Sequence, residues 1–202
     1  MNHYPANVPT HASHTAVENV RRHEPMHVAE IGINKGATSL KFASLLAERP
    51  GTSLHLFDFA AKVEDVTRQV KAAGFQAVHG YPVSSALHDS YNWNLMRVLQ
   101  AGKVKFDYVF IDGAHTWNID ALAFLLVDRL LPVGGLVEFD DYVWSIRHSP
   151  TMNPDVFPMS RTLYSEEQIN ERQVALVIDL LVKTDNRYEE LVPNRLYRKV
   201  AE

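Results

Sequence analysis

Short apolar stretches alternate with longer segments that place apolar residues on one face. The predicted strands are His27 to Ile33, Ser53 to Phe59, Gln76 to Gly80, Phe106 to Ile111 and Leu136 to Phe139. The predicted helices between them are Ala37 to Glu48, Lys62 to Ala73, Ser85 to Gln100 and Trp117 to Leu131. This alternation is typical of a mostly parallel sheet that is covered by helices on both faces. The pattern therefore predicts an α/β fold.

The pattern changes after residue 141. Three prolines fall between residues 150 and 158, which predicts a surface loop over a site at the end of the sheet. A helix is predicted at residues 165–181, where apolar residues share one face. Two short strands at residues 188–192 and 195–200 flank the turn Pro193-Asn194, which predicts a hairpin at the end of the chain.

Residues 1–25 are predicted to be a loose N-terminal arm, and residues 26–202 a single domain. The arm carries four histidines, at positions 3, 11, 14 and 23, and includes a candidate short helix from Thr15 to Arg22. An arm that covers a cofactor or reaches a partner subunit is the alternative, since flexible termini can become ordered on binding. The histidines lack a regular ligand spacing, so they are not assigned to a metal.

Composition limits the kinds of partner. The chain has 202 residues, of which 46% are apolar and 22% charged, and a formal charge of −4. This charge argues against a general binder of nucleic acids, and no basic cluster is interleaved with aromatic residues. The chain has no cysteine, no signal-peptide pattern and no apolar run long enough to cross a bilayer. We expect a cytoplasmic protein without a membrane or nucleic-acid partner.

Acidic residues end two of the predicted neighbouring strands. Asp112 follows Phe110-Ile111, and Asp140 and Asp141 follow Glu138-Phe139. If the strands are parallel neighbours, the three aspartates meet at one rim of the sheet. Two unit charges about 4 Å apart repel by roughly 4 kcal/mol at an effective dielectric near 20. The cluster therefore needs a cation, protons or strong hydrogen bonds, and a divalent metal is the simplest of these.

A glycine-bearing turn follows the first predicted strand, in Glu30-Ile31-Gly32-Ile33-Asn34-Lys35-Gly36. Gly32 and Gly36 let the backbone approach a ligand, and the next helix offers free N–H groups at its start. Asn34 replaces the middle glycine of the dinucleotide fingerprint, which disfavours a pyrophosphate site. Asp58, at the end of the second strand, is a candidate acceptor for two ribose hydroxyls, and a helix-capping role is its alternative.

These motifs, in this order, resemble class I S-adenosylmethionine-dependent methyltransferases over about residues 27–145. Within that class, Phe110-Ile111-Asp112-Gly113-Ala114-His115, Leu130-Leu131-Pro132-Val133-Gly134-Gly135 and Asp140-Asp141-Tyr142 resemble the metal-dependent O-methyltransferases, closest to the macrocin and other sugar O-methyltransferases. The resemblance implies a Rossmann-like, doubly wound, mostly parallel seven-stranded sheet with an antiparallel C-terminal strand.

The resemblance also implies a catalytic site. Asp112, Asp140 and Asp141 would hold magnesium or another divalent cation, which prefers oxygen ligands. Asp141 stands where the catechol enzymes have asparagine, and this departure favours the sugar group. His115, three residues after Asp112, matches the family's general base, which takes a proton from the acceptor hydroxyl.

For the cofactor S-adenosylmethionine, the resemblance implies contacts from the glycine turn and from the ends of the next two strands. The methionine part would lie among Glu30, Gly32, Asn34 and Thr38, with Gly36 closing the turn, and Asp58 would bind the ribose. Tyr81 and Ser84 are candidates for the adenine, with a turn braced by Pro82 as the alternative. Aromatic residues that could form a wall beside a sugar are Trp117, Trp144 and Tyr142, although core or lid packing is the more common role of such residues.

Two other functions stay open at this point. One is a nicotinamide-dependent oxidoreductase on a related sheet, with Asp58 again on the ribose. The other is a non-catalytic binding module in which the acids make only structural hydrogen bonds. The expected acceptor is the hydroxyl of a small molecule, and a saccharide is suggested by the resemblance alone. The sequence also leaves a homodimer open.

Overall fold

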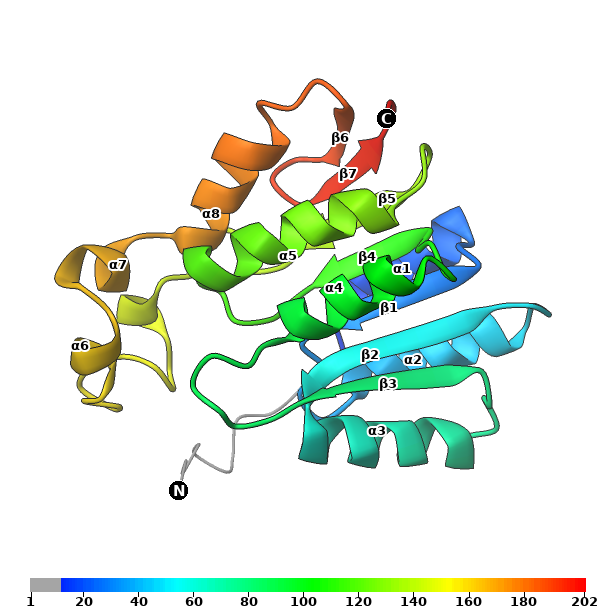
Figure 1. The fold of residues 1–202 in the computed structure, drawn as a ribbon, viewed down its shortest axis with the longest axis horizontal. Coiled ribbons are helices and arrows are strands. Elements are labelled where there is room, and N and C mark those ends of the chain that lie inside the picture. The colour runs from blue at the N-terminus through cyan, green and yellow to red at the C-terminus, as the bar shows by residue number, and fades with distance from the viewer. Residues whose placement is uncertain (1–11) are drawn as a thin grey trace.

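The stretches predicted as strands lie side by side in one sheet. In the computed structural model, which describes residues 12–202, seven strands have the order β3-β2-β1-β4-β5-β7-β6 (Figure 1). Their bounds are β1 (His27–Ile31), β2 (Ser53–Phe59), β3 (Val78–Val83), β4 (Tyr108–Ile111), β5 (Leu136–Phe139), β6 (Tyr188–Val192) and β7 (Leu196–Lys199). Strands β1 to β5 are parallel, and β7 is antiparallel to both of its neighbours. The predicted fold class is confirmed.

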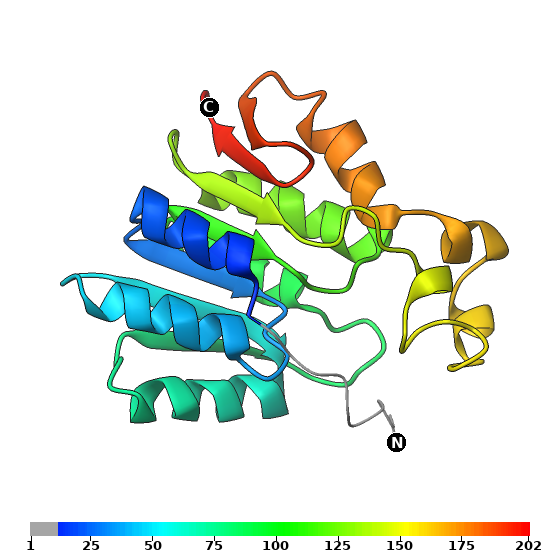
Figure 2. The same cartoon turned by 180° about the vertical axis from the view of Figure 1, so that it is seen from behind.

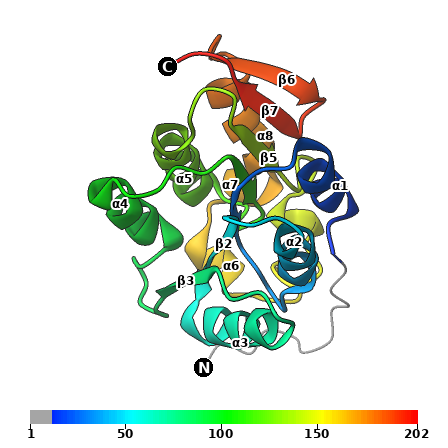
Figure 3. The ribbon, with the colours of Figure 1, turned by 90° about the vertical axis from the view of Figure 1, so that its right-hand side faces the viewer.

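Helices cover both faces of this sheet. One face carries α1 (His14–His23), α2 (Ala37–Ala47) and α3 (Ala60–Ala72), which Figure 2 shows in front of the strands. The other face carries α4 (Tyr91–Ala101), α5 (Trp117–Leu130) and α8 (Gln173–Val177), and Figure 3 shows the two layers from one end. Alternating side chains of β2 supply both cores, because Leu54 and Leu56 face α2 and α3 whereas Phe57 faces α4 and α5.

The segment predicted as a loose arm contains a packed helix. Ser13 caps α1, and the apolar stripe Ala16, Val17 and Val20 is buried in the core that α1 shares with α2, α3 and the sheet. This spacing puts the three side chains on one helical face, which the sheet covers. Residues 12–25 therefore do not form a loose arm. The histidines at positions 3 and 11 lie outside the described residues.

Residues 165–181 do not form the single helix that was predicted. They contain α7 (Glu166–Asn170), α8 and a π-helical turn, η2 (Ile178–Val182), and Glu171 between α7 and α8 has an extended backbone. The break lets the buried Gln173 accept a bond from the Trp117 N–H at the start of α5 (2.8 Å) and donate one to the Gln168 carbonyl (2.8 Å). The break in the predicted helix thus allows the Gln173 side chain to cap the start of α5.

The prolines after residue 141 lie in a lobe outside the sheet. The lobe contains η1 (Ile146–His148), α6 (Ser160–Leu163) and α7. It projects beyond the edge of the sheet at which β5 ends (Figure 1). Two other boundaries shift, because β3 extends to Val83 and α4 begins only at Tyr91. Among the helices of residues 12–202, none has both the length and the apolar character needed to cross a bilayer.

Candidate functional site

The carboxyl ends of β1, β2, β4 and β5 form one continuous rim. Backbone bonds from Gly32 to Phe57 (2.9 Å), from Asp112 to Ile31 (2.8 Å) and from Asp140 to Ile111 (3.0 Å) continue the strand pairing past the strand ends. A Cβ on Gly32 would overlap the carbonyl oxygen of Asp112, and its φ is +86°, so the close approach of the two loops requires glycine. The predicted acids of β4 and β5 therefore share one edge of the sheet.

Three side chains of this rim lie close enough to hold one cation. Nε2 of His115 is 3.1 Å from Oδ1 of Asp112 and 3.3 Å from Oδ2 of Asp141, and one ligand atom from each residue lies within 4.8 Å of the others. His115 and Asp141 have φ values of +57° and +60°. This conformation is uncommon for residues other than glycine and is frequent at functional sites.

The charges of the group explain its protonation. Burial lowers the pKa of His115. The hydrogen bond to Asp112 and the charges of Asp112 and Asp141 outweigh this effect and raise the pKa to about 9. Burial raises the pKa of Asp112 to about 6, against the opposing hydrogen bond from His115. Burial also raises the pKa of Asp141. At neutral pH the imidazole therefore carries a proton, and its single positive charge offsets part of the charge of the two carboxylates.

A buried pair supports the loop that carries His115. The Tyr91 hydroxyl accepts a bond from the Ala114 N–H (3.1 Å) and donates one to the buried Asp120. Gly113 packs on the same ring, because a Cβ there would lie 2.5 Å from the Tyr91 oxygen. The sequence reasoning did not identify Tyr91 or Asp120 as contributors to the site. The acid in the first turn of the helix after His115 was the available signal.

Asp140 lies at the same rim but binds a different group. Its Oδ1 accepts bonds from Nη1 of Arg195 (2.8 Å) and from the backbone N–H of Asp141 (3.0 Å). Asp140 is also absent from the group whose ligand atoms lie within 4.8 Å of one another. The structure therefore brings together Asp112, Asp141 and His115, and it turns the third aspartate toward the β6–β7 turn. No feature of the sequence pointed to Arg195.

Glu30 and Thr38, two predicted cofactor residues, are engaged behind the glycine turn. Glu30 is buried and accepts a bond from the Ser39 hydroxyl (2.5 Å), and burial raises its pKa to about 8. Oγ1 of Thr38 accepts the Ser13 N–H (2.9 Å), which fastens α1 to the start of α2. Gly36 begins α2 at φ +83°, and no side chain of residues 12–202 caps this helix start. The first N–H groups of α2 are therefore available to a ligand.

Asp58 braces the glycine turn. Its Oδ2 accepts the N–H groups of Ile33 (2.9 Å) and Asn34 (3.2 Å) and lies 3.2 Å from Lys62, and its Oδ1 accepts the Phe59 N–H (2.6 Å). Asn34 has a positive φ of 45°, which these bonds help to hold. The structure thus explains how Asp58 shapes the turn, and its ribose contact stays a prediction.

The two residues predicted to contact the adenine, Tyr81 and Ser84, have different surroundings. The Tyr81 ring stacks on Phe57 with centroids 4.3 Å apart, and its hydroxyl is 3.0 Å from Nδ1 of His55, nearer the start of β2. Tyr81 is therefore part of the packing between the sheet and α4, which leaves its predicted adenine contact without support. Ser84 lies past β3 in an exposed turn, where its N–H donates to Asp89 (2.7 Å). Its adenine contact stays a prediction.

The three aromatic residues considered as an acceptor wall have different surroundings. The Trp144 ring lies 5.1 Å from the His115 ring, centroid to centroid. Trp117 begins α5 and is 36% exposed. The Tyr142 hydroxyl instead donates to Asp179 on η2 (2.9 Å), which anchors the turn that carries Asp141. Trp144 and Trp117 remain available to contact an acceptor.

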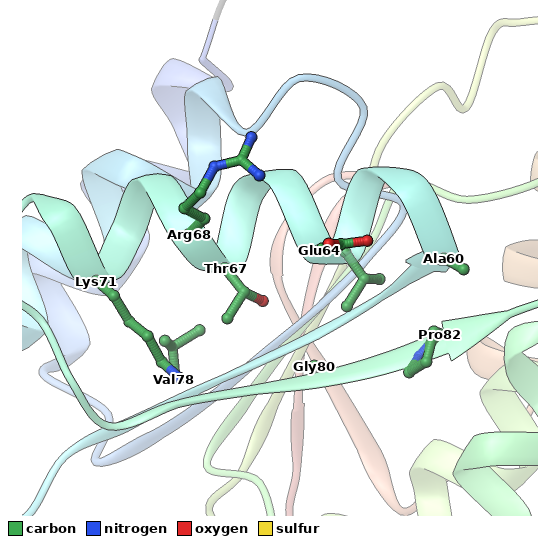
Figure 4. A pocket seen from close by; sticks show the side chains of 9 residues that line it. Ala60, Glu64, Thr67, Arg68, Lys71, Val78, Gly80 and Pro82 are labelled. Carbon is green, nitrogen blue, oxygen red and sulfur yellow. The ribbon is translucent and has the colours of Figure 1, made fainter.

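A shallow groove of about 590 Å³ lies elsewhere, between α3 and the edge strand β3 (Figure 4). Its lining includes Val63, Thr67, Lys71 and Gly80, and none of the residues that line it belongs to the predicted cofactor or cation sites. The Thr67 hydroxyl is buried there without a hydrogen-bond partner among the described residues. The groove therefore does not contribute to the rim site.

Known proteins share the sequence pattern and the fold. Residues 29–142, more than half of the chain, match the family described as methyltransferase domain. This segment contains the glycine turn, Asp58 and the whole acidic rim. No curated protein matches the chain significantly in sequence.

Solved structures of methyltransferases have the same architecture. An O-methyltransferase from Bacillus cereus in complex with SAH is 16% identical, with a TM-score of 0.66 over 97% of this chain and 86% of that one. TomG from Streptomyces achromogenes, an O-methyltransferase of tomaymycin synthesis in complex with SAM, is 15% identical (TM-score 0.58; 93% and 78% covered). The SAH-bound methyltransferase PaMTH1 from Podospora anserina is 17% identical (TM-score 0.60; 93% and 76% covered).

Proposed function

The chain belongs to the methyltransferase-domain family, and on this premise we propose that it transfers a methyl group from S-adenosylmethionine to a hydroxyl oxygen of a small molecule with the help of a divalent cation. The single observation that carries the proposal is the group formed by Asp112, His115 and Asp141 beside the glycine turn. Family membership favours methyl transfer over the nicotinamide-dependent alternative.

The residues around the glycine turn fit the proposed cofactor. Gly32 lets the turn pack against the Asp112 loop, Gly36 lets the start of α2 pack against Val66, and the uncapped start of α2 offers N–H donors for a carboxylate. Asn34 is exposed at the tip of the turn, where it can meet the methionine part. In this proposal, Asp58 and Ser84 serve the nucleoside, and Glu30 and Thr38 hold the turn in shape.

The donor set at the rim fits a hard divalent cation such as Mg²⁺. Oxygens of Asp112 and Asp141 would be its protein ligands, with Asp140 as the third predicted acid, because such cations prefer carboxylates. When bound, S-adenosylmethionine supplies an electrophilic methyl group, and the cation supplies positive charge that stabilises an ionised hydroxyl. His115 lies between the two carboxylates, where its Nε2 can accept the acceptor's proton once it has lost its own.

The proposed acceptor is a sugar or a glycosylated natural product. The support for this class is Asp141, which adds a carboxylate where the catechol enzymes have asparagine. The Trp144 ring beside His115 and the half-exposed Trp117 could stack on the apolar face of a ring. Catechols are the acceptor class to compare with it.

Calorimetry and a transfer assay test the proposal in sequence. We expect S-adenosylhomocysteine to bind and NAD not to bind. With methyl-labelled S-adenosylmethionine and a panel of glycosides and catechols, mass spectrometry should show label on a glycoside only when Mg²⁺ is present. Asp112→Asn should lower this rate by about 100-fold or more, since loss of a cation's charge stabilisation costs several kcal/mol.

Asp155→Asn is the matched control, because Asp155 has the same chemistry but is 77% exposed in the lobe. It should keep the wild-type rate. Label transfer at full rate in the presence of a chelator would exclude the cation from the mechanism. Failure of S-adenosylhomocysteine to bind would contradict the methyltransferase function itself.

A further inference from the structure

Two side chains, one from α4 and one from α5, hold the backbone of the loop that carries His115. The Tyr91 hydroxyl accepts the Ala114 N–H (3.1 Å) and donates to Asp120. Tyr91 is 7% exposed and Asp120 is 2% exposed, so these bonds are shielded from water. Burial raises the pKa of Asp120, and the backbone N–H groups of Ala114 and His115 are among the groups that oppose this rise. The loop backbone is thus bonded to one buried pair at two successive residues.

The loop also packs directly on the Tyr91 ring. A Cβ on Gly113 would lie 2.5 Å from the Tyr91 oxygen and 2.9 Å from two ring carbons, so this close approach requires glycine. Asn92, the next residue of α4, donates to the carbonyl of Ile119 in the first turn of α5 (2.9 Å). This bond fastens the start of α4 to the start of α5. The helices that supply Tyr91 and Asp120 are therefore fixed relative to each other.

The backbone of His115 needs such support. Its φ is +57°, in the left-handed region that residues with a Cβ rarely adopt. From this conformation its Nε2 reaches Asp112 (3.1 Å) and Asp141 (3.3 Å). An unfavourable backbone conformation persists where the surrounding structure enforces it. The bonds from the loop backbone to Tyr91 and Asp120 supply this enforcement.

We infer that Tyr91 and Asp120 are positioning residues, which fix the loop backbone so that Nε2 of His115 stays where it can take the proton of the acceptor hydroxyl. This inference rests on the proposed function. Both side chains are buried, so they act on the reaction through His115 and not by touching the acceptor. Displacing a reacting group by about 1 Å can lower a rate by about 100-fold. A purely structural pair would instead stabilise the packing of α4 on α5 and leave the reaction unchanged.

Tyr91→Phe tests the inference, because it keeps the ring on which Gly113 packs and removes only the hydroxyl. We expect kcat for methyl transfer to decrease by about 10- to 100-fold. KM for the acceptor and the calorimetric affinity for S-adenosylhomocysteine should stay within about twofold of the wild-type values. Without cofactor or acceptor, the Ala114 amide should exchange its hydrogen for deuterium at least about tenfold faster, which NMR measures.

Tyr188→Phe is the matched control, since the Tyr188 hydroxyl donates to the buried Asp128 near the other end of α5 (2.8 Å). It should lower the stability against urea, as Tyr91→Phe does, and keep the wild-type kcat. Gly113→Ala disturbs the Tyr91 contact from the side of the loop, and it should lower kcat with KM unchanged. This variant carries the test if circular dichroism shows that Tyr91→Phe does not fold.

Combining Tyr91→Phe with His115→Gln shows whether the effect passes through His115. Two changes that act through one group are not additive. In the His115→Gln protein, removal of the Tyr91 hydroxyl should therefore change the residual kcat by less than about twofold, because no base is left to be displaced.

The outcomes are distinct. A wild-type kcat in Tyr91→Phe, or a decrease of the same size with and without His115, would overturn the inference alone. An equal decrease in Tyr188→Phe would also overturn it, since this is what a purely structural role predicts. Unchanged exchange of the Ala114 amide would show that Tyr91 does not hold the loop, and the inference would be wrong. Absence of methyl transfer by the wild-type protein would overturn the inference together with the proposed function.

Discussion

The two ends of α5 carry charged clusters of opposite character. At its start, Asp112 and Asp141 meet a single imidazole, that of His115, and the backbone at two of the three residues has a positive φ. At its end, the buried Asp128 is held by the Tyr188 hydroxyl (2.8 Å), Arg187 (3.2 Å) and Lys199 (3.3 Å). The first cluster has an excess of acid, whereas the second pairs its acid with two cations.

This difference in charge balance indicates that the first cluster is suited to binding a cation, whereas the second stabilises the fold. Buried charges are tolerated when each has a partner, as with Lys199, which also donates to the carbonyl of Asp128 (2.8 Å). An acidic excess with a strained backbone costs stability and persists where the function requires it. We therefore expect changes at the start of α5 to affect the reaction and changes at its end to affect stability.

The largest expected effect is that of His115→Gln at the start of α5. Loss of a general base typically lowers a rate by about 10²–10⁴-fold. The single-turnover rate of methyl transfer should decrease by this factor, whereas the calorimetric affinity for S-adenosylhomocysteine should stay within about twofold of the wild-type value. An unchanged single-turnover rate would show that His115 is not the base.

At the other end of the helix, Asp128→Asn should destabilise the protein by about 3 kcal/mol, since it leaves the buried Lys199 with only the exposed Glu202, 3.7 Å away, as an acidic partner. Urea unfolding measures this loss. The transfer rate per folded molecule should stay at the wild-type value. A variant of wild-type stability, or one that is stable but inactive, would remove the distinction between the two clusters.

The smallest expected effect concerns His55, near the start of β2 and away from the rim. Burial lowers the pKa of His55 to about 3, and the neighbouring His79 and His27 charges add to the shift. The folded protein therefore binds fewer protons here than the unfolded chain, so stability decreases as the pH falls below the unfolded value of about 6.5. At pH 5 the loss amounts to about 2 kcal/mol.

His55→Gln should remove this part of the acid sensitivity, which urea unfolding at pH 7 and pH 5 measures. His79→Gln is the matched control, since His79 stacks on His55 (4.8 Å between centroids) but is exposed. If the two variants lost the same stability between pH 7 and pH 5, burial of His55 would not be the cause.

The local sequence was sufficient to predict most of the architecture. Apolar runs and turn residues gave the strand order along the chain, the helices between the strands and the final hairpin. Because successive parallel strands end at the same edge, the acids after β4 and β5 could be placed at one rim before any contact was known. The boundaries that shifted, at Val83 and Tyr91, lie on either side of one loop. In this loop the Asp89 side chain accepts a hydrogen bond from the backbone N–H of Ser84.

Only the tertiary structure decided which side chains of the rim act together. Arg195 reaches Asp140 across 55 positions of the chain and Ser13 across 182. Gln173 likewise caps α5 across 56 positions. Local patterns carry no information about such contacts, because the rotamer of a side chain depends on which partners the tertiary packing brings within hydrogen-bonding distance. The sequence therefore placed the acids at one edge, and the packed fold directed one of them away from the others.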